Sequence, residues 1–239
     1  MNTIRLHVRG QMGVQILQAA TAISVINSDE EPILCVNTGG DLSYDSTNKL
    51  QDVFDVNCRI IEIDTIRKTP YWVEGSAKYI FKNRDKIFRW LTPKANISPN
   101  PDIIGRLGIH IRGKDKHVAS IESYKHLLTI ARADRVTHAD GPDSLVIYSD
   151  DTELAAKTYP EHTISNQSSI ADWIDLYNSD IVYAAPSAFI MSMLIFNPNK
   201  RIVFLGDKYC DGPYIGYRHD MLFLRECQAY CKNVTILDV

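Results

Sequence analysis

The sequence predicts an α/β fold in which two Rossmann-like domains face each other across a cleft. Short apolar segments typical of strands alternate with longer segments of good helix formers along most of the 239 residues, and this pattern favours parallel sheets covered by helices. The segment "LTPKANISPNP" (91–101) contains three prolines and interrupts the pattern. It separates two similar halves, so we expect an N-terminal domain over residues 1–97 and a C-terminal domain over 98–239. One larger doubly wound domain is the alternative.

The first half opens with a β-α-β pattern. "TIRLHV" alternates like a strand, a long apolar stretch of helix formers follows it, and "SDEEP" ends that helix. A polar, Gly-rich loop comes after the second strand and contains Asp41. The expected strands are 3–8, 33–36 and 58–63, and the expected helices are about 12–26 and 72–92.

The second half continues the alternation to its end. Ser120 is a candidate N-cap for one helix, and acidic residues open the helix that begins near Asp151. The expected strands are 106–112, 144–149, 162–165, 180–185 and 201–205, and the expected helices are 120–132, 151–159, 169–179, 187–196 and 219–231. The last of these helices is a candidate to return to the N-terminal domain.

Composition excludes several classes of protein. A formal net charge of −3 argues against bulk binding to nucleic acid or an anionic membrane. No segment approaches the roughly 18 apolar residues of a membrane span, and no apolar export signal opens the sequence. Five cysteines without a C-x-x-C pair predict neither a disulfide framework nor a zinc site. We therefore expect a cytoplasmic protein.

Three polar clusters follow expected strands of the second half: "HIRGKDK" (110–116), "YSDD" (148–151) and "APSAF" (185–189). Ligands of open α/β sheets bind at the carboxyl ends of strands. The guanidinium of Arg112 could grip a phosphate, with Lys116 adding a point charge. Each cluster also has a structural interpretation, namely a solvated turn for the first, a helix cap at Asp151 for the second and an N-cap at Ser187 for the third.

Taken in order, these clusters resemble the motifs of GDP-fucose-dependent fucosyltransferases, chiefly the α-1,2 type and more distantly the α-1,6 and rhizobial nodulation enzymes. "QMGVQILQ" (11–18) is similar to the family's G-L-G-N-Q-x-F-Q at Gly13, Gln15 and Gln18. The family's H-x-R-R-G-D is matched by His110, Arg112 and Asp115, with Gly113 where the second arginine is expected. "YSDD" resembles F-S-D-D, and Asp172, Ser187 and Phe189 match the last motif.

The resemblance implies a GT-B-like fold, an enzyme that transfers fucose from GDP-fucose to a glycan hydroxyl with inversion, and no requirement for a metal or other cofactor. Arg112 would stabilise the diphosphate leaving group. Asp115 and Asp41 are the candidates for activating the acceptor, although Asp115 could instead orient Arg112. The implied donor-binding residues are His110, Arg112, Lys116, Asp150, Asp151, Ser187, Phe189, Gly13 and Gln15.

Two other classes of function remain open from the sequence. The altered second arginine, together with Val14 where the family has asparagine, leaves open a non-catalytic module that binds a nucleotide sugar or a glycan, and a transferase that uses another GDP-sugar is a further alternative. An NAD(P)-linked α/β enzyme is a further alternative, although "RGQMGVQ" (9–15) is not a G-x-G-x-x-G fingerprint.

Overall fold

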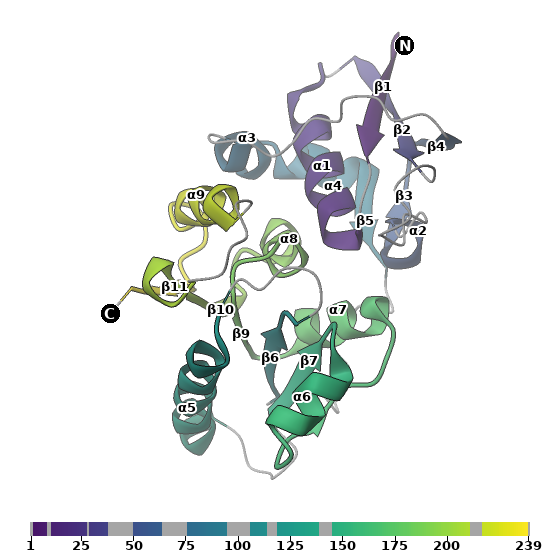
Figure 1. Cartoon of the computed structure of the whole chain (residues 1–239). Coiled ribbons are helices and arrows are strands. Elements are labelled where there is room, and N and C mark those ends of the chain that lie inside the picture. Colours follow the sequence, from purple (N-terminus) through teal and green to yellow (C-terminus); the bar gives the residue numbers. More distant parts are fainter. Residues whose placement is uncertain are drawn as a thin grey trace. The chain divides into compact units, whose positions relative to one another are not determined.

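A computed structural model of the chain is shown in Figure 1. It describes residues 2–8, 11–27, 29–37, 50–63, 76–94, 106–113, 119–138, 145–210 and 217–238. The chain divides into two compact units. Unit 1 contains Met1–Asn96 together with Ala188–Asn197, and unit 2 contains Ile97–Ser187 together with Pro198–Val239.

The element that the C-terminal half contributes to unit 1 is helix α8 (Ala188–Phe196). The last helix, α9 (Tyr217–Cys227), which the sequence made the candidate for this exchange, belongs to unit 2. Almost every side chain of α8 is buried, and its own apolar residues are distributed around the whole circumference of the helix. A helix of this composition must be covered all round, and α1 and α4 pack against it within unit 1.

Unit 1 is built on a three-stranded parallel sheet with the order β1-β2-β4. Its strands are β1 (Asn2–Val8), β2 (Glu30–Asn37) and β4 (Arg59–Ile63), and a separate antiparallel pair consists of β3 (Phe54–Val56) and β5 (Leu91–Pro93). Its helices are α1 (Met12–Val25), α2 (Leu50–Val53), α3 (Ser76–Lys82), α4 (Arg84–Trp90) and α8. Of the single helix expected over 72–92, residues 72–75 lie outside the described ranges, the part from 76 to 90 is two short helices with Asn83 between them, and 91–92 belong to β5.

The core of unit 1 forms around α1 and α8. Phe196 of α8 packs on Phe54 and Phe88, with ring centroids 4.6 and 5.4 Å apart. Arg84 of α4 donates from Nε to the carbonyl of Ile195 at 2.7 Å, which satisfies one of the carbonyls left without a partner at the end of α8. Apolar packing and a charged cap thus hold α8 in this unit.

Unit 2 is built on a six-stranded, entirely parallel sheet with the order β11-β10-β9-β6-β7-β8. Its strands are β6 (Leu107–Ile111), β7 (Leu145–Ser149), β8 (Thr163–Ile164), β9 (Ile181–Ala184), β10 (Arg201–Leu205) and β11 (Val234–Leu237). Its α-helices are α5 (Ile121–His138), α6 (Thr152–Thr158), α7 (Ser169–Asn178) and α9. The strands β6, β7 and β9 are buried at every position, as expected for a sheet covered on both faces.

The chain runs outward from β6 through β7 to β8 and then returns to the other side of β6 to form β9. The connections that leave β6 and β9 therefore diverge, although the two strands are neighbours, with His110 paired to Ala184. Such a switch point opens a crevice at the carboxyl ends of the strands, where ligands of open α/β sheets bind. The topology of unit 2 thus marks one edge of its sheet as the place for a site.

Lys200, at the opposite end of the same sheet, directly precedes β10 and is only 4% exposed. Its Nζ donates to the carbonyl of Tyr177, near the end of α7, at 3.0 Å. Desolvation lowers the pKa of Lys200 to about 7, against a smaller opposing effect of Asp180.

None of the helices within the described ranges is long and apolar enough to cross a membrane.

Candidate active site at the carboxyl edge of the second sheet

Two of the predicted clusters come together where β6 and β7 end. Ile111 pairs with Ser149 at the last position of the two strands, so Arg112 and Asp150 are the first residues beyond that ladder. The third cluster directly follows β9, the other neighbour of β6, and contains Ser187. Arg112 and Ser187 thus follow the two strands that border the switch point, whereas Asp150 and Asp151 follow β7.

Side chains hold the turn after β6. The N–H of Arg112 donates to the hydroxyl of Tyr124 on α5 at 3.2 Å. The N–H of Gly113 donates to Oδ1 of Asp150 at 2.6 Å. These bonds replace the strand ladder where β6 has ended, so the position of Arg112 is fixed from two directions.

Asp151 caps helix α6, as its structural interpretation predicted. Its Oδ1 accepts the N–H of Leu154 at 3.0 Å, and its own N–H donates to Oγ of Ser149 at 3.1 Å. Ser120 also caps the start of α5, where it accepts the N–H of Ser123 at 3.2 Å. Both helices after β6 and β7 therefore begin at defined points beside the turn that carries Arg112.

Gly113 has no room for a side chain. A Cβ placed there would lie 2.7 Å from Cβ of Asp151, well inside van der Waals contact. Gly113 occupies the position of the second arginine in the fucosyltransferase motif. Asp151, which caps α6, leaves no space there for a larger residue. Arg112, which is half-buried, is the cation that the described part of this turn presents.

A cavity of about 300 Å³ lies beside this turn, between the first turn of α5 and the length of α6. Buried apolar residues form much of its wall, and Ile121 and Leu154, which are 47% and 40% exposed, also line it. Its lining residues include Ile111, Arg112, Ile121, Tyr124, Asp151, Leu154 and Tyr159. Most pockets for organic ligands have this character, a largely apolar wall with a few polar groups.

Sequence reasoning missed the part of this cavity that α5 and α6 supply. Tyr124, Leu154 and Tyr159 belong to no recognisable motif. Only their position in the chain could have predicted that they line the cavity, because the first turn of a helix that follows a parallel strand lies near the carboxyl edge of the sheet. That rule would have identified Tyr124 and Leu154, and it would not have found Tyr159, at the end of α6.

His110 lies within β6 and is 8% exposed. Burial, with a smaller contribution from the charge of Arg112, lowers the pKa of His110 to about 3. The imidazole is therefore neutral at physiological pH and adds no positive charge to this edge. The expected role of His110 in positioning the donor stays a prediction.

The remaining expected donor-binding residues are at or near helix α8 and in α1. Ser187 directly precedes α8 and is fully buried, and Phe189 is half-buried in its first turn. Gly13 packs so tightly in unit 1 that a Cβ there would overlap the backbone of Ala188 and Phe189. Gln15, on the same helix as Gly13, is fully buried. The described structure thus gives the "QMGVQILQ" motif a role in packing α1 against α8.

Replacing Gly13 with valine should lower the free energy of unfolding by about 1–3 kcal/mol, because the new side chain must force the backbones of α1 and α8 apart. Urea denaturation measures this loss. Val25→Ala, at an exposed position of the same helix, is the control and should change stability little. Equal stability of Gly13→Val and the wild type would mean that the close approach of the two helices is not required.

Asp41, Asp115 and Lys116 lie outside the described residues, so their predicted roles stay predictions. Asp172, in the first turn of α7, accepts a hydrogen bond from Oγ of Ser165 at 2.6 Å, and burial raises its pKa to about 6. Among the residues that the structure describes, no group of three or more His, Cys, Asp and Glu side chains is arranged to hold a metal ion.

The sequence matches no family model and no curated protein. Among solved structures, the E. coli heptosyltransferase WaaC with ADP is similar, with a TM-score of 0.52 and 8% identity over 99% of this chain and 92% of that chain. The chain has a GT-B-like α/β fold. This confirms the predicted fold class and, at such low identity, shows the fold alone. The fucosyltransferase NodZ from Bradyrhizobium has a TM-score of 0.48 and 14% identity over 88% of this chain and 96% of that chain.

Proposed function

We propose that the protein is a glycosyltransferase that transfers a sugar from a nucleoside-diphosphate sugar to a hydroxyl of a glycan, with GDP-fucose as its donor. The observation that carries this proposal is the position of Arg112. It follows β6 at the switch point of the sheet, its backbone is held by Tyr124, and it lines the cavity. The carboxyl ends of the strands are where an open α/β sheet binds its ligand, and a guanidinium suits a diphosphate.

The proposed chemistry needs little from the protein besides charge and position. The acceptor oxygen forms a bond to the anomeric carbon of the sugar while the bond from that carbon to the diphosphate oxygen breaks. The electron pair of the broken bond stays on the diphosphate, where Arg112 stabilises the developing charge. The proton of the acceptor hydroxyl passes to a carboxylate, for which Asp115 and Asp41 are the candidates.

Two observations support the choice of GDP-fucose as donor, one from a similar structure and one from the sequence motifs. WaaC, which shares the fold, was solved with ADP, and ADP supports a nucleoside diphosphate as the part of the donor bound here. Guanine and fucose rest on the resemblance of "HIRGKDK" and "YSDD" to fucosyltransferase motifs. Asp150 and Asp151 accept backbone N–H groups at Oδ1, and ionised carboxylates also accept hydrogen bonds from the N–H groups of a base.

A specific observation favours a second candidate, a module that binds a nucleotide sugar without turning it over. The crowding of Gly113 by Asp151 leaves no room for an arginine side chain at position 113, the place of the second arginine in the fucosyltransferase motif. A single guanidinium stabilises less charge on the leaving group than two, while it suffices to hold a diphosphate.

Thermal-shift titration of the full chain with GDP, ADP, UDP, NAD and the corresponding sugar nucleotides tests the proposed function. We expect GDP and GDP-fucose to raise the melting temperature, because a ligand that binds only the folded state stabilises it. A shift with NAD alone would favour the NAD(P)-linked alternative, and no shift with any nucleoside diphosphate would contradict the proposal. GDP release from GDP-fucose in the presence of glycan acceptors then separates the enzyme from the binding module.

A further inference from the structure

The turn that carries Arg112 is held by two anchors of unequal burial. The ladder between β6 and β7 ends at Ile111, and the next two backbone N–H groups donate to side chains, first to Tyr124 and then to Asp150. Asp150 is exposed, so water competes for its carboxylate. Tyr124 is 3% exposed and its ring is fixed in the cavity wall. The tyrosine is therefore the rigid anchor.

The hydroxyl of Tyr124 is suited to this task at every relevant pH. Burial raises the pKa of its phenol well above the ordinary value, so the group stays neutral and keeps its geometry. The hydroxyl oxygen lies 3.2 Å from the N of Arg112, within hydrogen-bonding distance. If this acceptor were lost, the N–H of Arg112 would need another partner at the end of a buried strand, and the turn would move to find one.

We propose that Tyr124 is a positioning residue, which fixes the direction of the Arg112 side chain by accepting the hydrogen bond of its backbone N–H. This inference rests on the proposed function, because it assigns to Tyr124 a part in diphosphate binding that acts only through Arg112. The backbone dihedrals of Arg112 set the direction of its Cα–Cβ bond. A turn that relaxes would therefore carry the guanidinium away from the diphosphate.

Tyr124→Phe keeps the ring and removes only the acceptor. We expect it to weaken the binding of GDP, measured by calorimetry, by about 3- to 10-fold, the usual cost of one hydrogen bond. Arg112→Lys keeps a positive charge and loses the planar fork, so it should weaken binding as well. The double variant should bind GDP no more weakly than Arg112→Lys alone, because Tyr124 acts only through the arginine.

Tyr183→Phe is the matched control. It also removes one buried tyrosine hydroxyl from unit 2, where the hydroxyl donates to Asp134 at 2.5 Å, away from the cavity-lining residues. It should lower the stability of the protein and leave the affinity for GDP unchanged. Equal losses of affinity in Tyr124→Phe and Tyr183→Phe, or additive losses in the double variant, would overturn the positioning role.

Hydrogen exchange of the ligand-free protein tests the anchor apart from nucleotide binding. The amide of Arg112 should exchange faster in Tyr124→Phe than in the wild type, and unchanged exchange would overturn the proposal. If the wild type binds no nucleoside diphosphate, the proposed function fails, and with it the part of Tyr124 in that function. Faster exchange would then still show that Tyr124 holds the turn, so the two failures are distinguishable.

Discussion

Arg112→Ala should lower kcat/KM for sugar transfer by about 10²–10³-fold, the usual effect of removing one preorganised group that stabilises charge in a transition state. In the proposed reaction the leaving group is a nucleoside diphosphate that gains negative charge as the glycosidic bond breaks. The guanidinium of Arg112 is the cation that the described turn offers to this charge, since His110 is neutral and Gly113 carries no side chain. GDP release in the presence of acceptor measures the loss.

Arg132→Ala is the control for this experiment. Arg132 lies on α5 in the same unit, and its half-exposed side chain pairs with Glu161 on the surface at 2.8 Å. A surface pair of this kind contributes little to stability, so Arg132→Ala should transfer the sugar at the wild-type rate. Unaltered GDP release in Arg112→Ala would reject the assignment of Arg112, and loss of activity in both variants would indicate a general effect of charge.

The buried amine of Lys200 should make the free energy of unfolding depend on pH. The folded-state pKa of Lys200 is about 7 and its ordinary value is 10.5, so between these limits the unfolded chain binds a proton that the folded protein does not. The free energy of unfolding should therefore rise with pH in this window, by up to about 1.4 kcal/mol per pH unit for one proton. Below pH 7 both states hold the proton, and this contribution stays at its lowest level.

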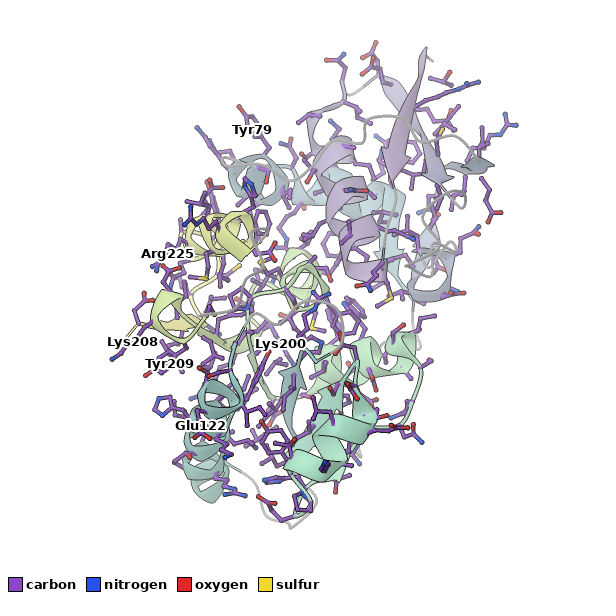
Figure 2. All side chains as sticks on the ribbon, in the orientation of Figure 1. Tyr79, Glu122, Lys200, Lys208, Tyr209 and Arg225 are labelled. Atoms are coloured by element: carbon purple, nitrogen blue, oxygen red, sulfur yellow. The ribbon has the colours of Figure 1, made fainter. Side chains whose placement is uncertain are left out.

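Lys200→Met removes the buried amine and should abolish this dependence. We expect the variant to be more stable than the wild type near pH 7, and the difference to shrink as the pH approaches 10, when burial of the neutral amine no longer requires loss of a proton. Lys208→Met, at an exposed lysine of the same unit, is the control and should retain the wild-type slope (Figure 2). Urea denaturation between pH 7 and 10 provides the measurement, and parallel curves for the wild type and Lys200→Met would contradict this prediction.

Local patterns predicted five of the six strands of the second sheet because these strands are short, apolar and bounded by polar residues, whereas β11 was not among the predicted strands. The run "LVIYS" is buried at every position as β7, and the polar residues after it lie at the carboxyl edge where the topology of a parallel sheet brings them. The break at Asn83 escaped prediction, because the apolar periodicity of 72–92 continues across it. There the side-chain amide of Asn83 donates to the carbonyl of Tyr79 at 2.9 Å, beside the backbone N–H of the same residue, and α3 ends at Lys82. Apolar periodicity does not report such a local contact.

In the candidate site too, features encoded by neighbouring residues could be predicted from the sequence, whereas contacts between distant segments could not. The position of Arg112 at the end of a strand was predicted because strand, charge and turn are contiguous in "HIRGKDK". The hydrogen bond from Arg112 to Tyr124 and the collision of Gly113 with Asp151 depend on how α5 and α6 pack against the sheet. No pattern in the sequence specifies such contacts, and the same holds for the packing of Gly13 against Phe189.

The membership of α8 in unit 1 has a consequence for synthesis on the ribosome. The nascent chain has completed Asn96 long before Ala188 emerges, so the helix that covers α1 is missing during that interval. At about 5–20 residues per second, the wait lasts several seconds or more, and apolar surface of α1 is open to chaperones throughout. The N-terminal half therefore cannot mature independently as a finished domain. Both halves must reach their native states together, and a gene divided at the proline-rich segment would encode a first fragment without a complete core.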